Sequence, residues 1–208
     1  DLLAYSRVTT RAQPFVKVNM NDVARMVLSD LDLKIEEIRA QRDLTYAESG
    51  ELEPDFQPVA TRDLVQHLQR TYARHPVARK RTIATAEIWP GEIVTDARLL
   101  GRVLGNMIKN GLEAIPQGQT VTVRCVERGE DVVFSVHNPG LMPPDVQAQV
   151  FQRSFSTKAK SGRGIGTHSM KLLGERYLGG KVEFRSQEAA GTTFTITLPK
   201  ITRQRPGD

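Results

Sequence analysis

Residues 95–114, TDARLLGRVLGNMIKNGLEA, contain the strongest secondary-structure signal in the chain. Seven apolar residues fall on one stripe at helical spacing, which predicts a helix with one face buried in a core. These residues are Leu99, Leu100, Val103, Leu104, Met107, Ile108 and Leu112. Thr95 or Asp96 is suited to cap the start of this helix, and Pro116 and Gly118 mark its exit.

The segments on either side of this helix predict further helices and strands. Upstream, the pattern indicates a helix capped by Thr61 and an extended segment. Downstream, it indicates a hairpin, a short helix, a polar loop, a second helix and a last hairpin. The first helix covers residues 61–74 and the extended segment 82–88. The first hairpin covers 119–127 and 131–136, and the short helix, the polar loop and the second helix cover 144–151, 152–162 and 167–178. The last hairpin covers 181–186 and 192–198. Helices packed against a largely antiparallel sheet make the expected fold class α+β, a two-layer α/β sandwich.

Two N-terminal stretches of the chain resemble each other at a constant offset of 41 residues. The residues Leu3, Tyr5, Phe15, Val18 and Asp22 recur without a gap as Leu44, Tyr46, Phe56, Val59 and Asp63. Each copy has the pattern of a helix end, a polar loop, a short extended segment and a new helix. Two explanations stay open: a duplication or a join of two related pieces, or a likeness in composition alone.

The composition of the 208-residue chain, with 39% hydrophobic and 25% charged residues, is that of a globular protein. We expect no signal peptide, because the first residues lack a basic region and a long apolar run, and the sequence contains no run of the roughly 18 to 20 apolar residues that a membrane helix needs. A single cysteine, Cys125, excludes an internal disulfide and a multi-cysteine zinc site, and we expect it to be a buried strand residue. The net charge of +5 suits an anionic ligand but is too dispersed to indicate nucleic-acid binding. Because the chain starts at Asp1 and not at Met, we expect a longer parent protein.

The predicted helix also carries polar residues suited to phosphate chemistry. Asn106 and Asn110 are four residues apart and share a face beside the apolar stripe. Their amide oxygens are candidate ligands for Mg²⁺, and Lys109 adds a positive charge. Gly111 costs about 1 kcal/mol in a helix interior relative to Ala, which suggests that another group approaches the backbone there. The alternative is that both asparagines simply face solvent.

Two further motifs follow this helix. Residues 136–143, VHNPGLMP, come directly after a predicted strand, where Asn138 leaves the strand and Gly140 lets the chain turn past a flat ligand. A plain strand-ending turn has the same pattern. Residues 162–169, GRGIGTHS, form a glycine loop that opens a helix, and such a loop offers backbone amides to phosphate. This loop matches neither the dinucleotide-binding fingerprint, which follows a strand, nor the Walker pattern, which ends in Gly-Lys-Ser/Thr.

Taken together and in this order, the motifs resemble the ATP-binding catalytic domain of sensor histidine kinases, which has the Bergerat-type ATPase fold. The resemblance covers about residues 56–199. Four boxes carry it: an asparagine box at 106–114, a phenylalanine box at 151–158, and glycine boxes at 162–169 and 191–194. It implies a mixed, mostly antiparallel five-stranded sheet with three helices on one face, and ATP held between two helices under a mobile lid.

The resemblance also implies roles for single residues. Asn110 would bind Mg²⁺, with Asn106 beside it and Lys109 near the phosphates, so these three are the candidate catalytic residues. The candidate nucleotide-binding residues are Asn138, Gly140, Lys158, Gly162, Gly164, Gly166, Thr167, Thr192 and Thr193. Within this set, the lysine would belong to the lid, the glycines of the 162–169 box to its hinge, and the last two threonines to the surroundings of adenine.

One box departs from the pattern of the family. The family has an aspartate after this strand that accepts a hydrogen bond from the adenine amino group, whereas this chain has Asn138, between His137 and Pro139. The side-chain oxygen of Asn138 is still an acceptor, but without charge, so we expect weaker adenine binding. The loop is also one residue shorter than the family pattern, which affects the alignment of Asn138.

We divide the chain into four parts. Residues 1–40 form a partial helix–strand–helix segment similar to the end of a dimerisation helix and the opening of an ATP-binding domain. Residues 41–55 are expected to be a linker, 56–200 the ATP-binding catalytic domain, and 201–208 a disordered tail.

The function we expect is that of the ATP-binding catalytic domain of a bacterial two-component sensor histidine kinase, with ATP and Mg²⁺ as cofactors. Its γ-phosphate acceptor would be a histidine outside this chain, because His67, His75, His137 and His168 all lack the acidic residue that follows the acceptor histidine. The expected partners are the dimerisation and phosphoacceptor helix domain of the parent kinase and the receiver domain of a response regulator, with no nucleic acid and no membrane contact by this chain. The expected location is the cytoplasm, and attachment of the parent protein to a membrane stays open.

Two other functions stay open. A non-catalytic module of the same fold, acting in protein–protein signalling, would account for the missing aspartate. An ATP-hydrolysing relative has less support, because such enzymes place a glutamate base four residues before the magnesium asparagine, where this chain has Asn106.

Overall fold

The computed structural model describes residues 19–152 and 165–201 of the chain. The chain divides into two compact units, residues 1–43 and 44–208. Helix α2 (Met20–Ser49) begins in the first unit and ends in the second. The extended segment expected at residues 15–18 lies outside the described residues, so the proposed repeat stays a prediction.

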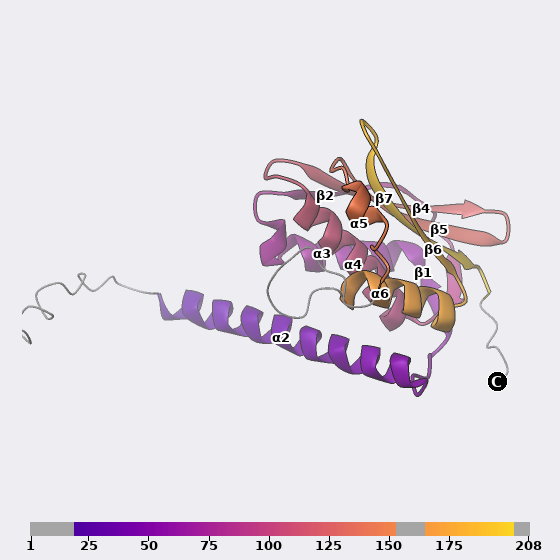
Figure 1. The fold of residues 1–208 in the computed structure, drawn as a ribbon. Coiled ribbons are helices and arrows are strands. Elements are labelled where there is room, and N and C mark those ends of the chain that lie inside the picture. The colour runs from indigo at the N-terminus through magenta and orange to yellow at the C-terminus, as the bar shows by residue number, and fades with distance from the viewer. Residues whose placement is uncertain (1–18, 153–164, 202–208) are drawn as a thin grey trace, which may run out of the picture. The chain divides into compact units, whose positions relative to one another are not determined.

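A five-stranded sheet forms the centre of the second unit (Figure 1). In spatial order its strands are β2 (Thr82–Ile88), β4 (Thr120–Arg128), β5 (Asp131–Asn138), β7 (Gly191–Pro199) and β6 (Lys181–Gln187). The β2–β4 pair is parallel and the other three pairs are antiparallel. One face is covered by α3 (Thr61–Ala73), α4 (Ala97–Ala114) and α6 (Ile165–Lys171). The structure therefore confirms an α+β two-layer sandwich with a mixed, mostly antiparallel sheet and three helices on one face.

Short elements complete the second unit. They are β1 (Gln57–Ala60), β3 (Glu92–Thr95), the 3₁₀ turn η1 (Pro76–Ala78), α5 (Pro144–Gln147) and the π-helical segment η2 (Leu172–Tyr177). β1 and β3 pair in an antiparallel fashion as a separate two-stranded sheet. In the parts of the chain that the structure describes, no helix has both the length and the hydropathy to cross a membrane.

Helix α4 forms the centre of the helical layer. Asp96 caps it, because its carboxylate accepts a hydrogen bond from the backbone N–H of Leu99 at 2.9 Å. All seven residues of the predicted apolar stripe are buried. Gly111 lies against β4: a Cβ at this position would be 3.2 Å from a methyl group of Val121. The close approach that the glycine predicts is therefore present.

The covered and open faces of the sheet follow the alternation of side chains along each strand. On β5, Val132, Phe134, Val136 and Asn138 are buried, whereas the residues between them are partly exposed. Cys125 on β4 is also fully buried, as predicted, and its burial raises the pKa of the thiol to about 11. The core thus lies between the sheet and the three helices.

One expectation about local structure was wrong. Thr61 is the first residue of α3 and not its N-cap. Its hydroxyl instead donates to the backbone carbonyls of Trp89 and Gly91, which joins the start of α3 to the β2–β3 connection. The segment assigned as a linker, residues 41–55, begins with the last residues of α2, and the division of the chain into four parts stays a prediction.

Candidate functional site

The asparagine motif of α4 meets the end of the glycine motif, residues 162–169, at the start of α6. The side-chain amide of Asn106 donates from Nδ2 to Ser169 Oγ at 2.9 Å and to the carbonyl oxygen of Gly166 at 3.4 Å. The Ser169 hydroxyl in turn donates to the same carbonyl at 3.0 Å. Residues 60 or more positions apart in the sequence therefore form one hydrogen-bonded cluster, and Ser169 is a member that the sequence analysis did not single out.

Asn110 lies one helical turn beyond Asn106 on the same side of α4. It is partly exposed, and among the described residues its amide has no hydrogen-bond partner. Its side-chain oxygen is therefore available to a ligand. Gly166 and Thr167 lie in the first turn of α6, and a Cβ on Gly166 would be 3.9 Å from the Asn106 amide.

Lys109 is three residues after Asn106 on α4. It is four residues after Gly105, where a Cβ would be 2.5 Å from the Tyr72 hydroxyl of α3. The pKa of His75, which stacks on Tyr72, is lowered by burial and also by the positive charge of Lys109. Lys109 is therefore close enough to His75, directly before η1, to affect its pKa, and its expected place near the phosphates stays a prediction.

The motif of residues 136–143 begins at the end of β5, where Asn138 lies beside Gly111 of α4. Asn138 is 2% exposed, and its Oδ1 accepts a hydrogen bond from the Gly140 N–H at 2.9 Å. Its Nδ2 lies 3.7 Å from the position of a Cβ on Gly111, next to Asn110 in sequence. We expected Oδ1 to be the acceptor for an adenine amino group; the turn uses one of its two lone pairs, so this role stays a prediction.

Thr192 holds the loop that follows Asn138. It is 3% exposed, and its hydroxyl donates to the Gly140 carbonyl at 2.7 Å. The same hydroxyl lies 2.7 Å from Ser186 Oγ, which accepts a hydrogen bond from the Met142 N–H at 2.8 Å. The loop is close to β7 because Gly191 has φ of +72° and a Cβ there would be 2.3 Å from the Asn138 carbonyl oxygen.

Thr193 lies outside this site. It is opposite His137 in the β5–β7 register, and its hydroxyl is 3.1 Å from His137 Nδ1. Side chains alternate along a strand, so Thr193 is on the open face whereas Thr192 faces the helices. Thr193 therefore faces away from the turn after Asn138, contrary to our expectation, and the place of Thr192 near the nucleotide stays a prediction. Lys158, Gly162 and Gly164 lie outside the described residues.

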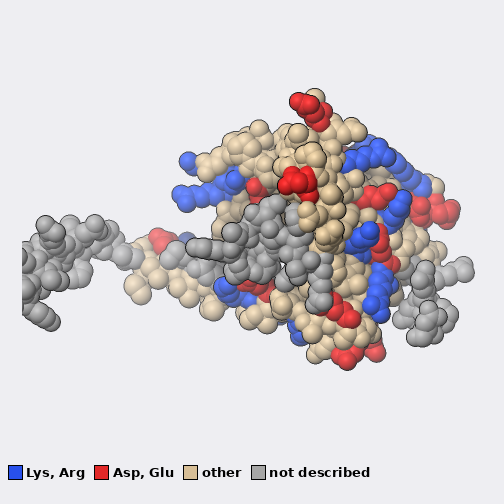
Figure 2. All heavy atoms as spheres, in the orientation of Figure 1, with Lys and Arg blue, Asp and Glu red and all other residues tan. Residues whose placement is uncertain are grey.

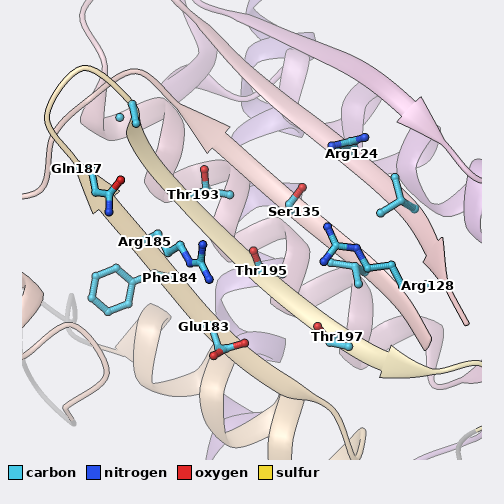
Figure 3. A pocket seen from close by; sticks show the side chains of 14 residues that line it. Arg124, Arg128, Ser135, Glu183, Phe184, Arg185, Gln187, Thr193, Thr195 and Thr197 are labelled. Carbon is cyan, nitrogen blue, oxygen red and sulfur yellow. The ribbon is translucent and has the colours of Figure 1, made fainter. Parts of the chain in front are cut away.

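The open face of the sheet has a shallow trough of about 440 Å³ (Figure 3). Hydroxyl-bearing residues of β5 and β7, such as Ser135 and Thr195, form its floor, and Arg124 and Arg185 lie at its sides. The trough is on the opposite side of the sheet from Asn138. On the face drawn in Figure 2, lysine and arginine residues are interspersed with acidic ones, which agrees with the dispersed charge of the sequence.

Comparison with known proteins identifies the family. Residues 95–202 match the model of the family described as histidine kinase-, DNA gyrase B-, and HSP90-like ATPase. The sensor protein DivL of Caulobacter vibrioides is 28% identical over 210 residues, which are 99% of this chain and 26% of that protein. The sensor histidine kinase ZraS of Escherichia coli is 33% identical over 154 residues, which are 73% of this chain and 33% of that protein. This chain thus spans about a quarter to a third of these two relatives.

Solved structures have the same fold. The catalytic domain of the histidine kinase ThkA matches with a TM-score of 0.65 and 21% identity, over 73% of this chain and 99% of that domain. Full-length ShkA, solved in complex with AMPPNP, matches with a TM-score of 0.69 and 20% identity, over 93% of this chain and 42% of ShkA. The chain therefore belongs to the histidine kinase-, DNA gyrase B-, and HSP90-like ATPase family, and its fold is that of the catalytic domain of a sensor histidine kinase.

Proposed function

We propose that this chain binds Mg-ATP along α4 and transfers the γ-phosphate to a histidine on the dimerisation and phosphoacceptor helices of a parent sensor kinase. One observation carries this proposal: motifs far apart in the sequence meet on α4. Asn106 contacts Gly166 and Ser169, and Asn138 lies beside Gly111. Asn110, whose amide has no hydrogen-bond partner in the described part of the chain, lies between these two contacts on α4.

The residues of this cluster fit a magnesium-bound triphosphate. Mg²⁺ prefers oxygen ligands and keeps several water molecules, so one side-chain oxygen from Asn110 suffices as a protein ligand. The Nδ2 of Asn106 donates hydrogen bonds to groups in α6, so its Oδ1 stays able to accept one from a ligand. When bound there, Mg²⁺ would neutralise phosphate charge. The protein would hold the nucleotide in place, since positioning and charge neutralisation dominate phosphoryl transfer.

The cluster favours phosphotransfer over ATP hydrolysis. A hydrolytic relative needs a carboxylate base at position 106 to activate water. Asn106 cannot accept a proton in this way, and its amide is already engaged by Ser169 and Gly166. The acceptor of the phosphate would then be the phosphoacceptor histidine, and the receiver domain of a response regulator would be the next partner. A location in the cytoplasm, where ATP is supplied, is part of this proposal.

A second function has support from one residue. A non-catalytic signalling module of the same fold would have no need of a carboxylate at the end of β5, and this chain has Asn138 there. The two functions differ in whether Mg-ATP binds and whether binding depends on Asn110.

Titration of Mg-ATP against the wild type and the Asn110→Ala variant separates these functions. Ligand at 100 times its Kd stabilises a protein by about 2.7 kcal/mol, which is readily measured as a rise in Tm. We expect this rise for the wild type and for Asn21→Ala, a matched change at an exposed residue of α2, but a much smaller one for Asn110→Ala. Equal weak binding by all three proteins would favour the non-catalytic module.

A further inference from the structure

The hydrogen-bonded cluster at the start of α6 contains a buried hydroxyl group, that of Ser169. This residue is 2% exposed, and its Oγ donates a hydrogen bond to the carbonyl oxygen of Gly166 at 3.0 Å. The same Oγ accepts a hydrogen bond from Asn106 Nδ2 at 2.9 Å. A role for Ser169 rests on the proposed function, because it concerns what Asn106 presents to bound Mg-ATP.

The direction of these hydrogen bonds is determined by the Gly166 carbonyl. A carbonyl oxygen can only accept, and a serine hydroxyl has a single proton to donate. Ser169 donates this proton to Gly166, so its oxygen meets Asn106 as an acceptor. Both groups that contact the Asn106 amide in α6 are therefore acceptors. Nδ2 is the atom of this amide that can satisfy them, because Oδ1 has no proton to donate.

Of the two contacts that hold the Asn106 amide, the one with Ser169 is the stronger. Nδ2 lies 2.9 Å from Ser169 Oγ, a usual length for a hydrogen bond, but 3.4 Å from the Gly166 oxygen, which is longer than usual. Asn106 is partly exposed, so burial alone does not determine how its amide is turned. Without the hydroxyl only the long contact would remain, and the amide could rotate. Ser169 thus determines which atom of Asn106 faces α6.

The orientation of this amide matters for a bound cation. With Nδ2 turned to Ser169, Oδ1 is the atom of Asn106 that can meet a ligand, one helical turn before Asn110. Mg²⁺ takes oxygen ligands, and its bound water molecules donate to oxygen, whereas an amide NH₂ can do neither. We propose that Ser169 is a positioning residue of the nucleotide site, which keeps the Asn106 oxygen available to the Mg²⁺ complex of ATP without contacting the nucleotide itself.

Binding of Mg-ATP to a set of serine variants tests this proposal. Ser169→Ala removes the acceptor, and we expect Mg-ATP to bind about threefold to tenfold more weakly, the effect of losing one neutral hydrogen bond. The matched control is Ser135→Ala, the same change on the open face of the sheet, which should bind Mg-ATP like the wild type. Wild-type affinity in Ser169→Ala would overturn the positioning role and leave nucleotide binding intact. A wild type that does not bind Mg-ATP would overturn the proposed function itself.

A double-mutant cycle separates positioning from a structural role of Ser169. If Ser169 acts through the amide of Asn106, then Ser169→Ala should weaken Mg-ATP binding no further once Asn106→Ala is present. The same fold-loss in both backgrounds would mean that Ser169 only stabilises α6, and the proposal would be wrong.

The side-chain NH₂ signal of Asn106 gives a readout that needs no nucleotide. Asn106→Ala identifies this signal in a nitrogen–proton correlation spectrum of the full chain by its loss. In the wild type we expect this NH₂ group to exchange with water more slowly than that of Asn21, which is exposed on α2. Ser169→Ala should remove the difference, and Ser135→Ala should keep it. Exchange as fast as that of Asn21 in the wild type would overturn the positioning role, even if Ser169→Ala fails to fold.

Discussion

Thr192 and Thr193 are neighbours on β7 but lie on opposite faces of the sheet. Thr192 is buried and joins the turn after Asn138 to Ser186, whereas Thr193 is partly exposed and, among the described residues, its hydroxyl has a hydrogen bond to His137 alone. The same contrast extends along β5, where Asn138 faces the helices and His137 faces outward. A polar residue on the covered face must have partners, because no water reaches it. Polar residues on the open face have no such requirement.

The largest difference in stability should be between substitutions at Phe134 and at Ser135. These two residues lie on the covered and the open face at the centre of β5. Phe134 is fully buried, so Phe134→Ala should cost about 3–5 kcal/mol of the free energy of unfolding. Ser135→Ala removes a hydroxyl from the open face and should change stability by less than about 0.5 kcal/mol. Urea denaturation measures both. A loss of several kcal/mol for Ser135→Ala would mean that the open face is covered in solution.

A second test uses pH and the thiol of Cys125, on the covered face of β4. Burial raises its pKa from 9.0 to about 11, so the unfolded chain loses this proton at lower pH than the folded protein. The stabilisation from the neutral thiol is complete below pH 9 and is lost between pH 9 and pH 11, by about 2 kcal/mol in all.

The comparison of wild type with Cys125→Ala isolates this contribution, because lysine and tyrosine residues titrate in the same range in both proteins. The difference in unfolding free energy between them should change from pH 8 to pH 11. Parallel pH profiles for the two proteins would contradict the burial of the thiol.

A smaller effect is expected from the two threonines. Thr192→Val removes the hydrogen bonds to Gly140 and Ser186 and should cost roughly 1–2 kcal/mol, with weaker nucleotide binding as well. Thr193→Val should leave stability within about 0.5 kcal/mol and nucleotide binding unchanged. Thermal unfolding with and without Mg-ATP gives both quantities. Equal losses of nucleotide binding in the two variants would mean that Thr193 also affects the nucleotide site.

The sequence predicts the fold well because the strongest patterns are local. The apolar stripe of α4 and the alternation along β5 and β7 each determine which face is buried, and the structure agrees with them. The strand β3 and the π-helical segment η2 were not predicted, since they depend on contacts distant in sequence. Gly174 in η2 is an example: a Cβ there would be 2.5 Å from a methyl group of Val182.

The site was only partly predictable. The convergence of Asn106 with Gly166 and Ser169 is a tertiary fact that spacing alone does not give. The sequence alone could have shown that Thr193 lies on the other face from Thr192. Phe194 and Ile196 define the covered face of β7, and because side chains alternate along a strand, Thr192 shares this face and Thr193 does not. The hydrogen bond from the Gly140 N–H to Asn138 Oδ1 needed coordinates, since the sequence does not fix the conformation of a turn.

Gly191 has no side chain to offer a ligand, yet it determines where the Asn138 backbone lies. Any larger residue at position 191 would press on the Asn138 carbonyl and the following proline and would be strained at its positive φ. A random mutagenesis screen for lost nucleotide recognition should therefore recover substitutions at this glycine alongside those at Asn138. Such hits would be mistaken for direct contacts if judged by phenotype alone.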